Sequence, residues 1–422
     1  MTTNRAPWCG LVIWIFWGLI LAWPGPAHAD YGIRDGDTVV FLGDSITAAR
    51  TYGKIVENYT RLRFPDRKVH FINAGWGGDT AAGGLQRLER DVFDRGATVL
   101  IVAYGINDIG WGLKADAEHK RIYLDAIRGI VEKCKARKVR VYIGSAAITT
   151  EDPDKAEHGF LQSMCDEGMD VARTMGEHTI DIQRTMRRIQ RNVLAANAAT
   201  PPKDRATLHA ADGIHLSDLG QLAMAFAILK GLGAPAEVST VALDARGPRV
   251  VFAANCRVTN LACDPASGRI EFDRHDDGLP VNFGLFGALQ FRYVPIPDEL
   301  NRYILAMTDL PPGRYQVTAD GRALGTFTEK QFAAGLNIAS ATADGWQPGG
   351  PWDAEASLLI HLTNARDQIA QAALFLDHDL PNHPERSALH AQSKAINERI
   401  EDIQRTLLKP RPFHFVIHPA AK

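Results

Sequence analysis

The feature that most constrains the fold of this chain is a regular alternation of short apolar runs with longer helical stretches between residues 38 and 232. Short apolar runs bounded by turn residues are typical of strands that are buried on both faces of a sheet. Right-handed crossovers between such strands predict a three-layer α/β/α sandwich around a five-stranded parallel sheet. The five runs are TVVFLG (38–43), KVHFIN (68–73), ATVLIVAYG (97–105), VRVYIG (139–144) and HTIDI (178–182).

Helical periodicity fills the intervals between these runs, and a last helical stretch follows them. In open parallel sheets, ligands bind beyond the carboxyl ends of the strands. Residues that directly follow the apolar runs are therefore the first candidates for a functional site. The expected helices are 49–64, 80–94, 115–137, 155–175 and 217–232.

The N-terminus has the features of a secretory signal peptide. Arg5 precedes an apolar run of 16 residues from Trp8 to Trp23, which is shorter than the roughly 20 residues of a membrane-spanning helix. Ala27 and Ala29 form a small-x-small cleavage site. An uncleaved anchor is the alternative, but the length and flanks favour cleavage after Ala29. We therefore expect a secreted or periplasmic protein with no stable membrane span.

After residue 233 the sequence changes in character. The segment 233–248 interrupts the alternation, and short strand-like runs with turns follow over about 249–340. The Asp-Gly pair in ADGRA predicts a β-hairpin there. Two amphipathic helices are expected at about 353–376 and 384–408. The expected parts are a signal peptide (1–29), an α/β domain (30–235), a small β-rich domain (236–345) and a helical C-terminal region (346–422).

The cysteine spacing and the net charge limit the kinds of functional site that this chain is expected to carry. Export exposes the cysteines to an oxidising compartment, and Cys256 and Cys263 are close enough in sequence to close a small disulfide loop if the geometry allows. The chain has no CxxC motif, so neither a zinc ribbon nor a thioredoxin-type site is indicated. No metal and no other cofactor is expected. A net charge of −2 gives no support for a nucleic-acid partner.

Ser45, in FLGDSITAAR directly after the first apolar run, is the first candidate functional residue. The segment is not the GxSxG elbow of α/β-hydrolases, because Thr47 stands where the second glycine would be. Taken alone, a serine in a strand-to-helix turn is the simpler interpretation. A serine hydroxyl becomes a nucleophile only when a base takes its proton.

The loop sequence DGIHLS supplies a candidate base and a candidate orienting acid. In a tight turn, residues three apart come close together, so Asp212 can hold Nδ1 of His215 and leave Nε2 to face Ser45. The alternative is an ordinary turn before a helix that Ser217 caps. The position of the motif, just before the last helix of the α/β pattern, favours the first interpretation.

Candidate oxyanion donors follow the second and third strands. Gly78 lies in NAGWGGDT, where the absence of a Cβ lets a backbone N–H approach a ligand. Asn107 lies in YGIND and offers an uncharged side-chain donor that does not titrate. The Gly78 motif alone is equally consistent with a plain turn, and an Asn-Asp pair after a strand is usually a turn when it is taken alone. Together with Ser45, Asp212 and His215 they form an ordered set that a single turn interpretation does not explain.

These four motifs resemble the blocks of the SGNH, or GDSL-type, hydrolase superfamily. The matching segments are Gly43-Asp44-Ser45, Gly78 in GGDT, Gly105-Ile106-Asn107-Asp108 and Asp212-Gly213-Ile214-His215. The resemblance covers about 38–232. It implies a flavodoxin-like α/β/α fold and serine esterase chemistry without a metal. Ser45 would be the nucleophile, with an oxyanion hole made by the N–H groups of Ser45 and Gly78 and the amide of Asn107.

The substrate is less constrained by the sequence. Trp76 and Trp111 flank two of the motifs and would stack on a sugar ring, line an acyl pocket, or simply pack within their loops. Export and tryptophan-rich loops favour a carbohydrate O-acetyl esterase acting on a small-molecule or polysaccharide ester. The alternatives are a lipase, lysophospholipase or thioesterase, a sugar O-acyltransferase, and a binding protein that keeps an inactive esterase fold.

Two features of the C-terminal half stay open between a functional and a structural interpretation. Trp346 and Trp352 would form a carbohydrate-binding surface or, as we favour, hold the loop between the β-rich part and the helices. The apolar stripes of the two C-terminal helices are expected to pack on the protein itself or on a second copy. The oligomeric state is left open.

Overall fold

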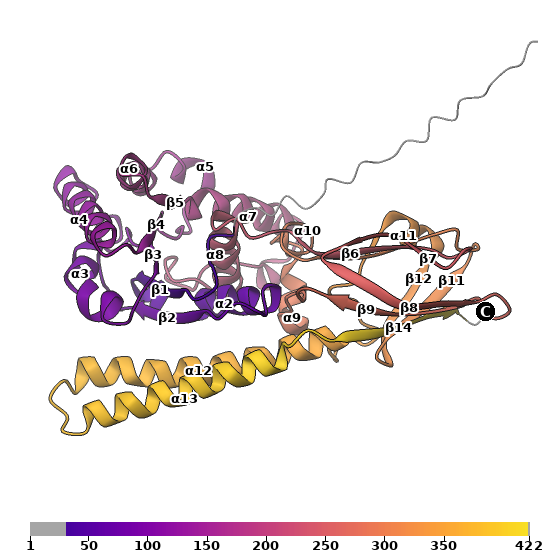
Figure 1. Cartoon of the computed structure of the whole chain (residues 1–422). Helices are drawn as coiled ribbons and strands as arrows, with labels where there is room; N and C mark the ends of the chain where they lie inside the picture. The colour runs from indigo at the N-terminus through magenta and orange to yellow at the C-terminus, as the bar shows by residue number, and fades with distance from the viewer. Residues whose placement is uncertain (1–30, 421–422) are drawn as a thin grey trace, which may run out of the picture.

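The computed structural model describes residues 31–420, so the expected signal peptide lies outside the described residues. The first part of the chain forms an all-parallel sheet in the order β2-β1-β3-β4-β5. The predicted five-stranded parallel sheet is thereby confirmed (Figure 1). Its strands are β1 (Thr38–Gly43), β2 (His70–Gly75), β3 (Val99–Ala103), β4 (Arg140–Gly144) and β5 (His178–Ile180).

Helices cover both faces of this sheet. Val39 and Phe41 of β1 pack in one core cluster, whereas Val40 and Leu42 pack in another, as the two-residue period of a doubly covered strand requires. The predicted helix at 155–175 is divided in two, and α7 lies where no helix was predicted. The helices are α1 (Ser45–Ala48), α2 (Thr51–Arg63), α3 (Ala81–Gln86), the π-turn η1 (Glu89–Phe93), the 3-10 turn η2 (Gly110–Gly112), α4 (Ala117–Ala136), α5 (Pro153–Ala156), α6 (Phe160–Thr174), α7 (Ile182–Asn197), the 3-10 turn η3 (Pro202–Asp204) and α8 (Asp218–Gly231).

The second part of the chain contains two further sheets. One has the order β13-β10-β6-β7 and the other β12-β11-β14-β9-β8. The strands are β6 (Glu237–Asp244), β7 (Arg249–Ala254), β8 (Cys256–Asp264), β9 (Arg269–Asp276), β10 (Arg302–Thr308), β11 (Arg314–Ala319), β12 (Arg322–Thr328), β13 (Leu336–Asn337) and β14 (Pro412–Pro419). Three short helices accompany them: α9 (Gly284–Gln290), α10 (Ile296–Glu299) and α11 (Glu329–Ala334).

Two strands of this part differ from the sequence expectation. β6 lies inside the segment 233–248 that was expected to interrupt the fold, and it pairs with β7 and β10. β14, at the end of the chain, pairs with both β9 and β11. The chain therefore returns to the β-rich part after the helices, and its last strand completes a sheet begun more than a hundred residues earlier.

The predicted Asp-Gly hairpin connects β11 and β12. Asp320 has φ 47° and Gly321 has φ 77°, and two consecutive positive φ angles are what a two-residue hairpin turn of this type requires. The local sequence was sufficient to predict this turn because the conformation is dictated by the two central residues.

The disulfide between Cys256 and Cys263 that the sequence suggested does not form. Both cysteines lie on β8 and both are free. Seven residues of extended strand span roughly 20 Å, which far exceeds the Cα separation that a disulfide bridges. Each thiol donates instead to a backbone carbonyl, that of Thr240 at 3.3 Å and that of Ala245 at 3.6 Å. Among the described residues, Cys134 and Cys165 are also free, and both are buried.

Trp352 and Trp346 have different environments. Trp352 is fully buried, its Nε1 donates to Ala339 O at 3.0 Å, and its ring stacks on Phe415 of β14 with centroids 5.9 Å apart. It therefore joins the first turn of α12 to the β-rich core. Trp346 is 81% exposed, so it does not share that structural role.

The two predicted C-terminal helices, α12 (Pro351–Asp379) and α13 (Arg386–Leu407), form a hairpin. Figure 1 shows the hairpin lying alongside the α/β part of the molecule, next to α2 and β2. No helix of residues 31–420 is long and apolar enough to cross a membrane. The face of the hairpin that is buried against the α/β part is largely polar and charged, whereas Leu358, Ile396 and Ile403 of its apolar stripes remain about half exposed.

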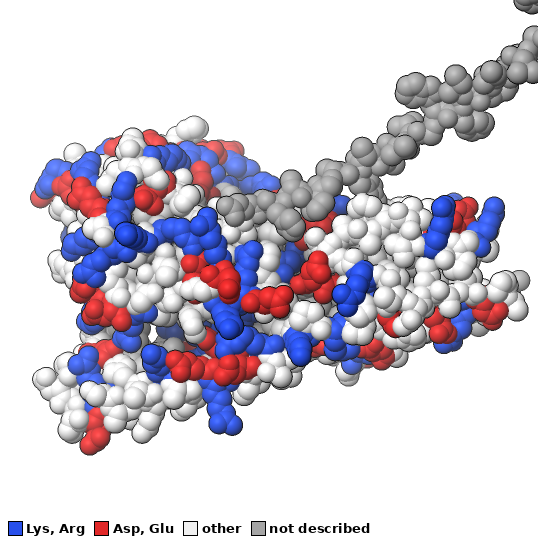
Figure 2. All heavy atoms as spheres, viewed as in Figure 1, with Lys and Arg blue, Asp and Glu red and all other residues white. Residues whose placement is uncertain are grey.

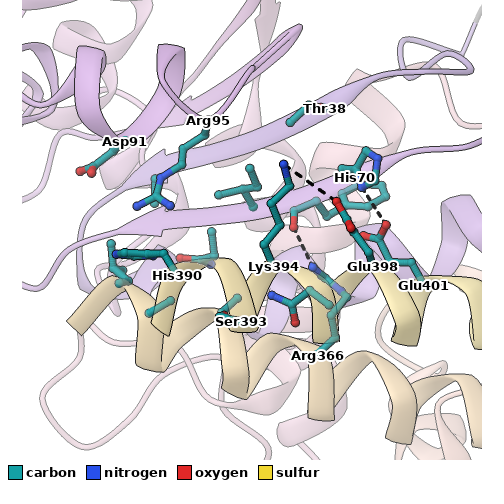
Figure 3. A pocket seen from close by; sticks show the side chains of 18 of the residues that line it. Thr38, His70, Asp91, Arg95, Arg366, His390, Ser393, Lys394, Glu398 and Glu401 are labelled. Atoms are coloured by element: carbon teal, nitrogen blue, oxygen red, sulfur yellow. Dashed lines mark hydrogen bonds and ion pairs between the residues drawn. The ribbon is translucent and has the colours of Figure 1, made fainter. Parts of the chain in front are cut away.

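The hairpin covers the outer edge of β2, which is an edge strand of the parallel sheet. Arg366 of α12 donates from Nη1 to Phe71 O of β2 at 3.0 Å and pairs with Glu57 of α2. A cavity of about 550 Å³ remains between hairpin and strand, and Figure 3 shows the charged side chains that line it. Oε2 of Glu401 lies 2.7 Å from Nδ1 of His70 there. An exposed strand edge is thus blocked by side chains of the same chain.

A buried ion pair joins the hairpin to the segment between α1 and α2. Arg50 donates from Nε and Nη2 to the two carboxylate oxygens of Asp367 at 2.7 and 2.6 Å, and the two side chains are only 6% and 10% exposed. Acidic and basic side chains are interspersed elsewhere on the face of the molecule that Figure 2 shows.

We expect Asp367→Ala to lower the free energy of unfolding by about 3–5 kcal/mol, because it leaves the guanidinium of Arg50 buried without its partner. Urea denaturation followed by circular dichroism measures this change. Glu398→Ala is the matched control on the same hairpin. Glu398 is 57% exposed and pairs with Lys394 only at 4.0 Å, so its loss should change stability by less than about 0.5 kcal/mol. Equal effects of the two substitutions would contradict the role given to the pair.

Candidate active site

The ends of β1 and β3 define the place of the candidate site. β1 lies between β2 and β3 in the sheet, so the chain leaves its first strand at the point where the strand order reverses and a crevice opens. Asp44 directly follows β1 and caps α1, because its Oδ1 accepts from Ile46 N at 2.9 Å. Ser45 is thereby placed at the first position of a helix, where its own N–H has no partner within the helix.

Ser45, His215 and Asp212 form a continuous hydrogen-bonded relay. Ser45 Oγ lies 2.9 Å from Nε2 of His215, and Nδ1 of His215 lies 2.6 Å from Oδ2 of Asp212. The structure therefore brings together three residues that are separated by up to 170 positions in the chain. His215 and Asp212 come from one tight turn near the end of the α/β part of the sequence, whereas Ser45 lies near its beginning.

The hydrogen bonds in the turn around Asp212 also determine which atoms of the relay carry protons. Oδ1 of Asp212 accepts from the backbone N–H groups of Ile214 and His215, both at 2.9 Å. These backbone bonds and the hydrogen bond from His215 lower the pKa of Asp212 to about 2. An ionised carboxylate accepts only, so Nδ1 of His215 must be the donor. The lone pair of Nε2 is then free to accept the Ser45 proton.

Gly78 lies in the loop after β2 and has φ +73°. No atom lies within 4 Å of the place that a Cβ would take there, so the glycine is needed for its backbone conformation rather than for space. Asn107, after β3, lies close to this loop, since its Nδ2 donates to the carbonyl of Asp79, the residue after Gly78, at 3.0 Å.

Trp111 determines which way the Asn107 amide points. Its indole Nε1 donates to Asn107 Oδ1 at 2.8 Å, and because an indole nitrogen only donates, the amide oxygen must face it. Nδ2 is then turned toward the Gly78 loop. One of its two protons is used by Asp79 O, and the other remains for a ligand. Trp111 is 51% exposed, and its ring lies edge-on to His215 with centroids 5.9 Å apart.

Arg87 is a supporting residue that the sequence did not indicate. It donates to Gly43 O at the end of β1, to Ala74 O near the end of β2, and to Tyr104 Oη just after β3. It also pairs with Asp79 at 2.8 Å. A single guanidinium thus ties together the three strand ends around the site. In the sequence it lies in a helical stretch rich in charge, which is typical of a solvated surface.

Asp108 is buried beneath the Asn107 loop. Its Oδ1 accepts from Ala81 N at 3.0 Å, and its Oδ2 has no hydrogen-bond partner among the described residues. Burial raises the pKa of Asp108 to about 7. The folded protein therefore keeps the proton up to about pH 7, whereas an unfolded chain releases it near pH 4. Because the folded state binds more protons in that window, this group lowers the free energy of unfolding as the pH rises from about 4 to 7.

We expect Asp108→Asn to remove this pH dependence. The stability of the variant relative to the unaltered protein should rise by the order of a few kcal/mol between pH 5 and pH 8, because the amide has no proton to lose. Urea denaturation at the two pH values measures the difference. Asp125→Asn on α4 is the control, since Asp125 is 52% exposed. A relative stability of Asp108→Asn that is the same at both pH values would refute the assignment.

The two tryptophans proposed as substrate-lining residues lie in different surroundings. Trp111 stands beside His215 as described. Trp76, in the loop between β2 and Gly78, packs against α12, with its ring 3.8 Å from that of His378 and 6.2 Å from that of Phe375. In the part of the chain that the structure describes, no group of three or more His, Cys, Asp or Glu side chains is arranged to hold a metal ion.

The fold and the family match together define an ester-hydrolysing enzyme built on an α/β/α sandwich. Residues 41–223 match the model of the GDSL-like lipase/acylhydrolase family. This match spans the four motifs from Ser45 to His215. No curated protein matches the chain in sequence.

Solved structures extend the comparison to the rest of the chain. BT4096, a gut microbial diltiazem-metabolizing enzyme, is 21% identical, with a TM-score of 0.79 over 94% of this chain and 100% of that one. The fold of both the α/β part and the C-terminal half thus recurs in one known structure. LAE5, an α/β hydrolase from the metagenome of Lake Arreo, is 21% identical and covers 48% of this chain and 98% of its own, with a TM-score of 0.40. Axe2, an acetylxylan esterase from Geobacillus stearothermophilus, is 19% identical and covers 48% of this chain and 96% of its own, with a TM-score of 0.39.

Proposed function

We propose that this enzyme is a secreted serine esterase that acts through Ser45, His215 and Asp212. His215 Nε2 takes the Ser45 proton as Oγ attacks the carbonyl carbon of an ester. Asp212 stabilises the imidazolium that results. The single observation that supports this mechanism is the relay of 2.9 and 2.6 Å contacts between the three side chains.

The oxyanion of the tetrahedral intermediate would be held by three donors. They are the N–H groups of Ser45 and Gly78 and the second Nδ2 proton of Asn107. When the intermediate collapses, the C–O bond to the alcohol breaks and His215 returns its proton to the leaving oxygen. A water molecule then attacks the acyl-enzyme by the same route and releases the carboxylic acid, which regenerates Ser45.

Covalent labelling tests this mechanism. A fluorophosphonate probe should modify Ser45 and no other serine, as peptide mass spectrometry of the labelled protein would show. The protein should also hydrolyse p-nitrophenyl acetate at neutral pH. Labelling at another position, or no labelling of an active preparation, would sink the assignment of Ser45.

We further propose that the natural substrates are O-acetylated carbohydrates. Two observations support this class. The side chains of His215 and Asp212 are 37% and 38% exposed, so a bulky alcohol can reach the relay from solvent. Trp111 is also exposed beside His215 and offers a flat apolar face of the kind that stacks on a sugar ring.

Acetate release from a panel of acetylated polysaccharides, compared with hydrolysis of long-chain glycerol esters, tests the substrate class. We expect acetate release with little activity on the long-chain esters. The reverse preference would favour a lipase. Transfer of acetyl to an added sugar, detected by mass spectrometry, would favour an acyltransferase.

Secretion is proposed from the sequence of residues 1–29. Expression of the full chain in a bacterium with a Sec pathway should yield a mature protein in the periplasm or medium. Its N-terminal residue should be Asp30. A protein that retains Met1 and sediments with the membrane would show an uncleaved anchor instead.

A further inference from the structure

α12 reaches from the β-rich part to the edge of the active site. The loop between β2 and Gly78 contains Trp76, which packs on His378 and Phe375 near the end of α12. Trp76 N also donates to Gly43 O at 3.0 Å, which joins the same loop to the end of β1, two residues before Ser45. The helix therefore contacts a loop that carries one of the proposed oxyanion donors.

A second contact joins α12 to the segment that follows the nucleophile. Arg50 lies two residues after α1, in the left-handed region with φ 67°, and holds Asp367 through the buried bidentate pair. The two segments on this side of Ser45 are thus both attached to one face of α12. One attachment is an ion pair and the other is a cluster of rings.

Between these two attachments lies a hollow of about 200 Å³, here called the α12 subsite. Phe375, a large apolar side chain that lines this hollow, is 45% exposed. An exposed ring in such a place is often a binding surface. The subsite is lined by Ala48, Arg50, Gly75, Trp76, Gly77, Gln371, Leu374 and Phe375, and the guanidinium of Arg50 is held by Asp367.

The α12 subsite lies on the β2 side of Ser45, whereas Trp111, which lies beside His215, follows β3 on the other side of β1. Ala48 is three residues after Ser45, and Gly75 and Trp76 immediately precede the Gly77-Gly78 pair. A substrate group that extends from Ser45 toward the end of β2 would therefore meet α12. In a domain made of the α/β part alone this direction would be open to solvent.

We propose that the α12 subsite receives a short apolar group of the ester substrate, so that α12 helps to set the substrate range of the site. The proposal rests on the proposed esterase function of Ser45. The lining side chains are chiefly apolar, which suits an alkyl or acyl group rather than a charged one. A volume of about 200 Å³ is below the roughly 300–1,000 Å³ of pockets for drug-sized ligands, so only a short group fits.

Substitutions at two lining residues test this proposal. Leu374→Trp fills the subsite, and Phe375→Ala enlarges it. Leu358→Ala is the control, because Leu358 is a half-exposed apolar residue of the same helix that does not line the subsite. The measurement is kcat/KM for p-nitrophenyl esters from acetate to hexanoate, with a parallel series of acetates of increasingly large alcohols. Thermal unfolding checks that each variant is folded.

We expect Leu374→Trp to lower the ratio of kcat/KM for the butyrate to kcat/KM for the acetate at least about tenfold. We expect Phe375→Ala to raise the ratio of kcat/KM for the hexanoate to kcat/KM for the acetate. If the alcohol series changes in this way instead of the acyl series, the subsite holds the alcohol side of the ester, which also supports the proposal. Ratios in both series that stay within twofold of those of Leu358→Ala, in folded variants, would overturn it. Failure of the esterase proposal can be distinguished from failure of the subsite proposal. In the first case no ester would be hydrolysed and no probe would label Ser45.

Discussion

Ser45→Ala is expected to lower kcat for p-nitrophenyl acetate by about 10⁴- to 10⁶-fold while leaving the fold unchanged. Removal of the nucleophile of a comparable triad costs on the order of 10⁶ in kcat, and what remains comes from the oxyanion donors and from binding. Ser45 Oγ contacts only His215 among the hydrogen bonds described for it. Its loss should therefore affect chemistry far more than stability.

Initial-rate kinetics on both proteins, purified in parallel to exclude a contaminating esterase, measure this effect. Ser217→Ala is a matched control, since Ser217 lies two residues after His215 and caps α8 through Gly220 N. Its loss should cost about 1 kcal/mol of stability with little change in kcat. An Ser45→Ala protein that keeps more than a tenth of the original kcat would remove Ser45 from the mechanism.

Asp212→Asn should lower kcat by about 10⁴-fold at neutral pH, with the three side chains still in contact. The expected cause is the tautomer of His215. An amide NH₂ in place of Oδ2 would donate to Nδ1, which would move the imidazole proton to Nε2 and leave no lone pair for the Ser45 proton.

The pH profile separates this cause from general damage to the site. Because the pKa of Asp212 is lowered to about 2, the carboxylate of the unaltered enzyme stays ionised at every pH at which the protein would be assayed. Activity of the unaltered enzyme should therefore show no acid limb from Asp212 above about pH 3. In Asp212→Asn, fluorophosphonate labelling of Ser45 should slow in parallel with kcat. Normal labelling with low kcat would place the defect in deacylation and contradict the tautomer explanation.

The arrangement of the α/β part was largely predictable because its signals are local. β1 begins and ends where the apolar run 38–43 predicted, since a strand buried on both faces must be apolar throughout. The loop that joins Asp212 to His215 was predictable for the same reason, as three residues of turn are enough to bring the two side chains together. The helix expected at 80–94 was predicted less well. Helix α3 ends before Arg87, whose side chain turns toward the strand ends.

The C-terminal half was predicted less well because its decisive contacts join distant segments. A strand such as β14 carries a weak alternating pattern, and its place between β9 and β11 depends on partners more than 90 residues away. The suggested Cys256–Cys263 disulfide failed because nearness in sequence is not nearness in space within an extended strand.

The sequence by itself determined the sheet, the order of the four motifs and the identity of Ser45, Asp212, His215, Gly78 and Asn107 as candidates, because strands, turns and their spacing follow from local periodicity. Only the tertiary structure decided that α12 contacts both the loop after β2 and the segment between α1 and α2. The Arg50–Asp367 pair spans 317 positions, and the contact of Trp76 with His378 spans a similar distance. Neither leaves a periodic signal, because an ion pair or a ring contact needs one residue at each end and no pattern between them.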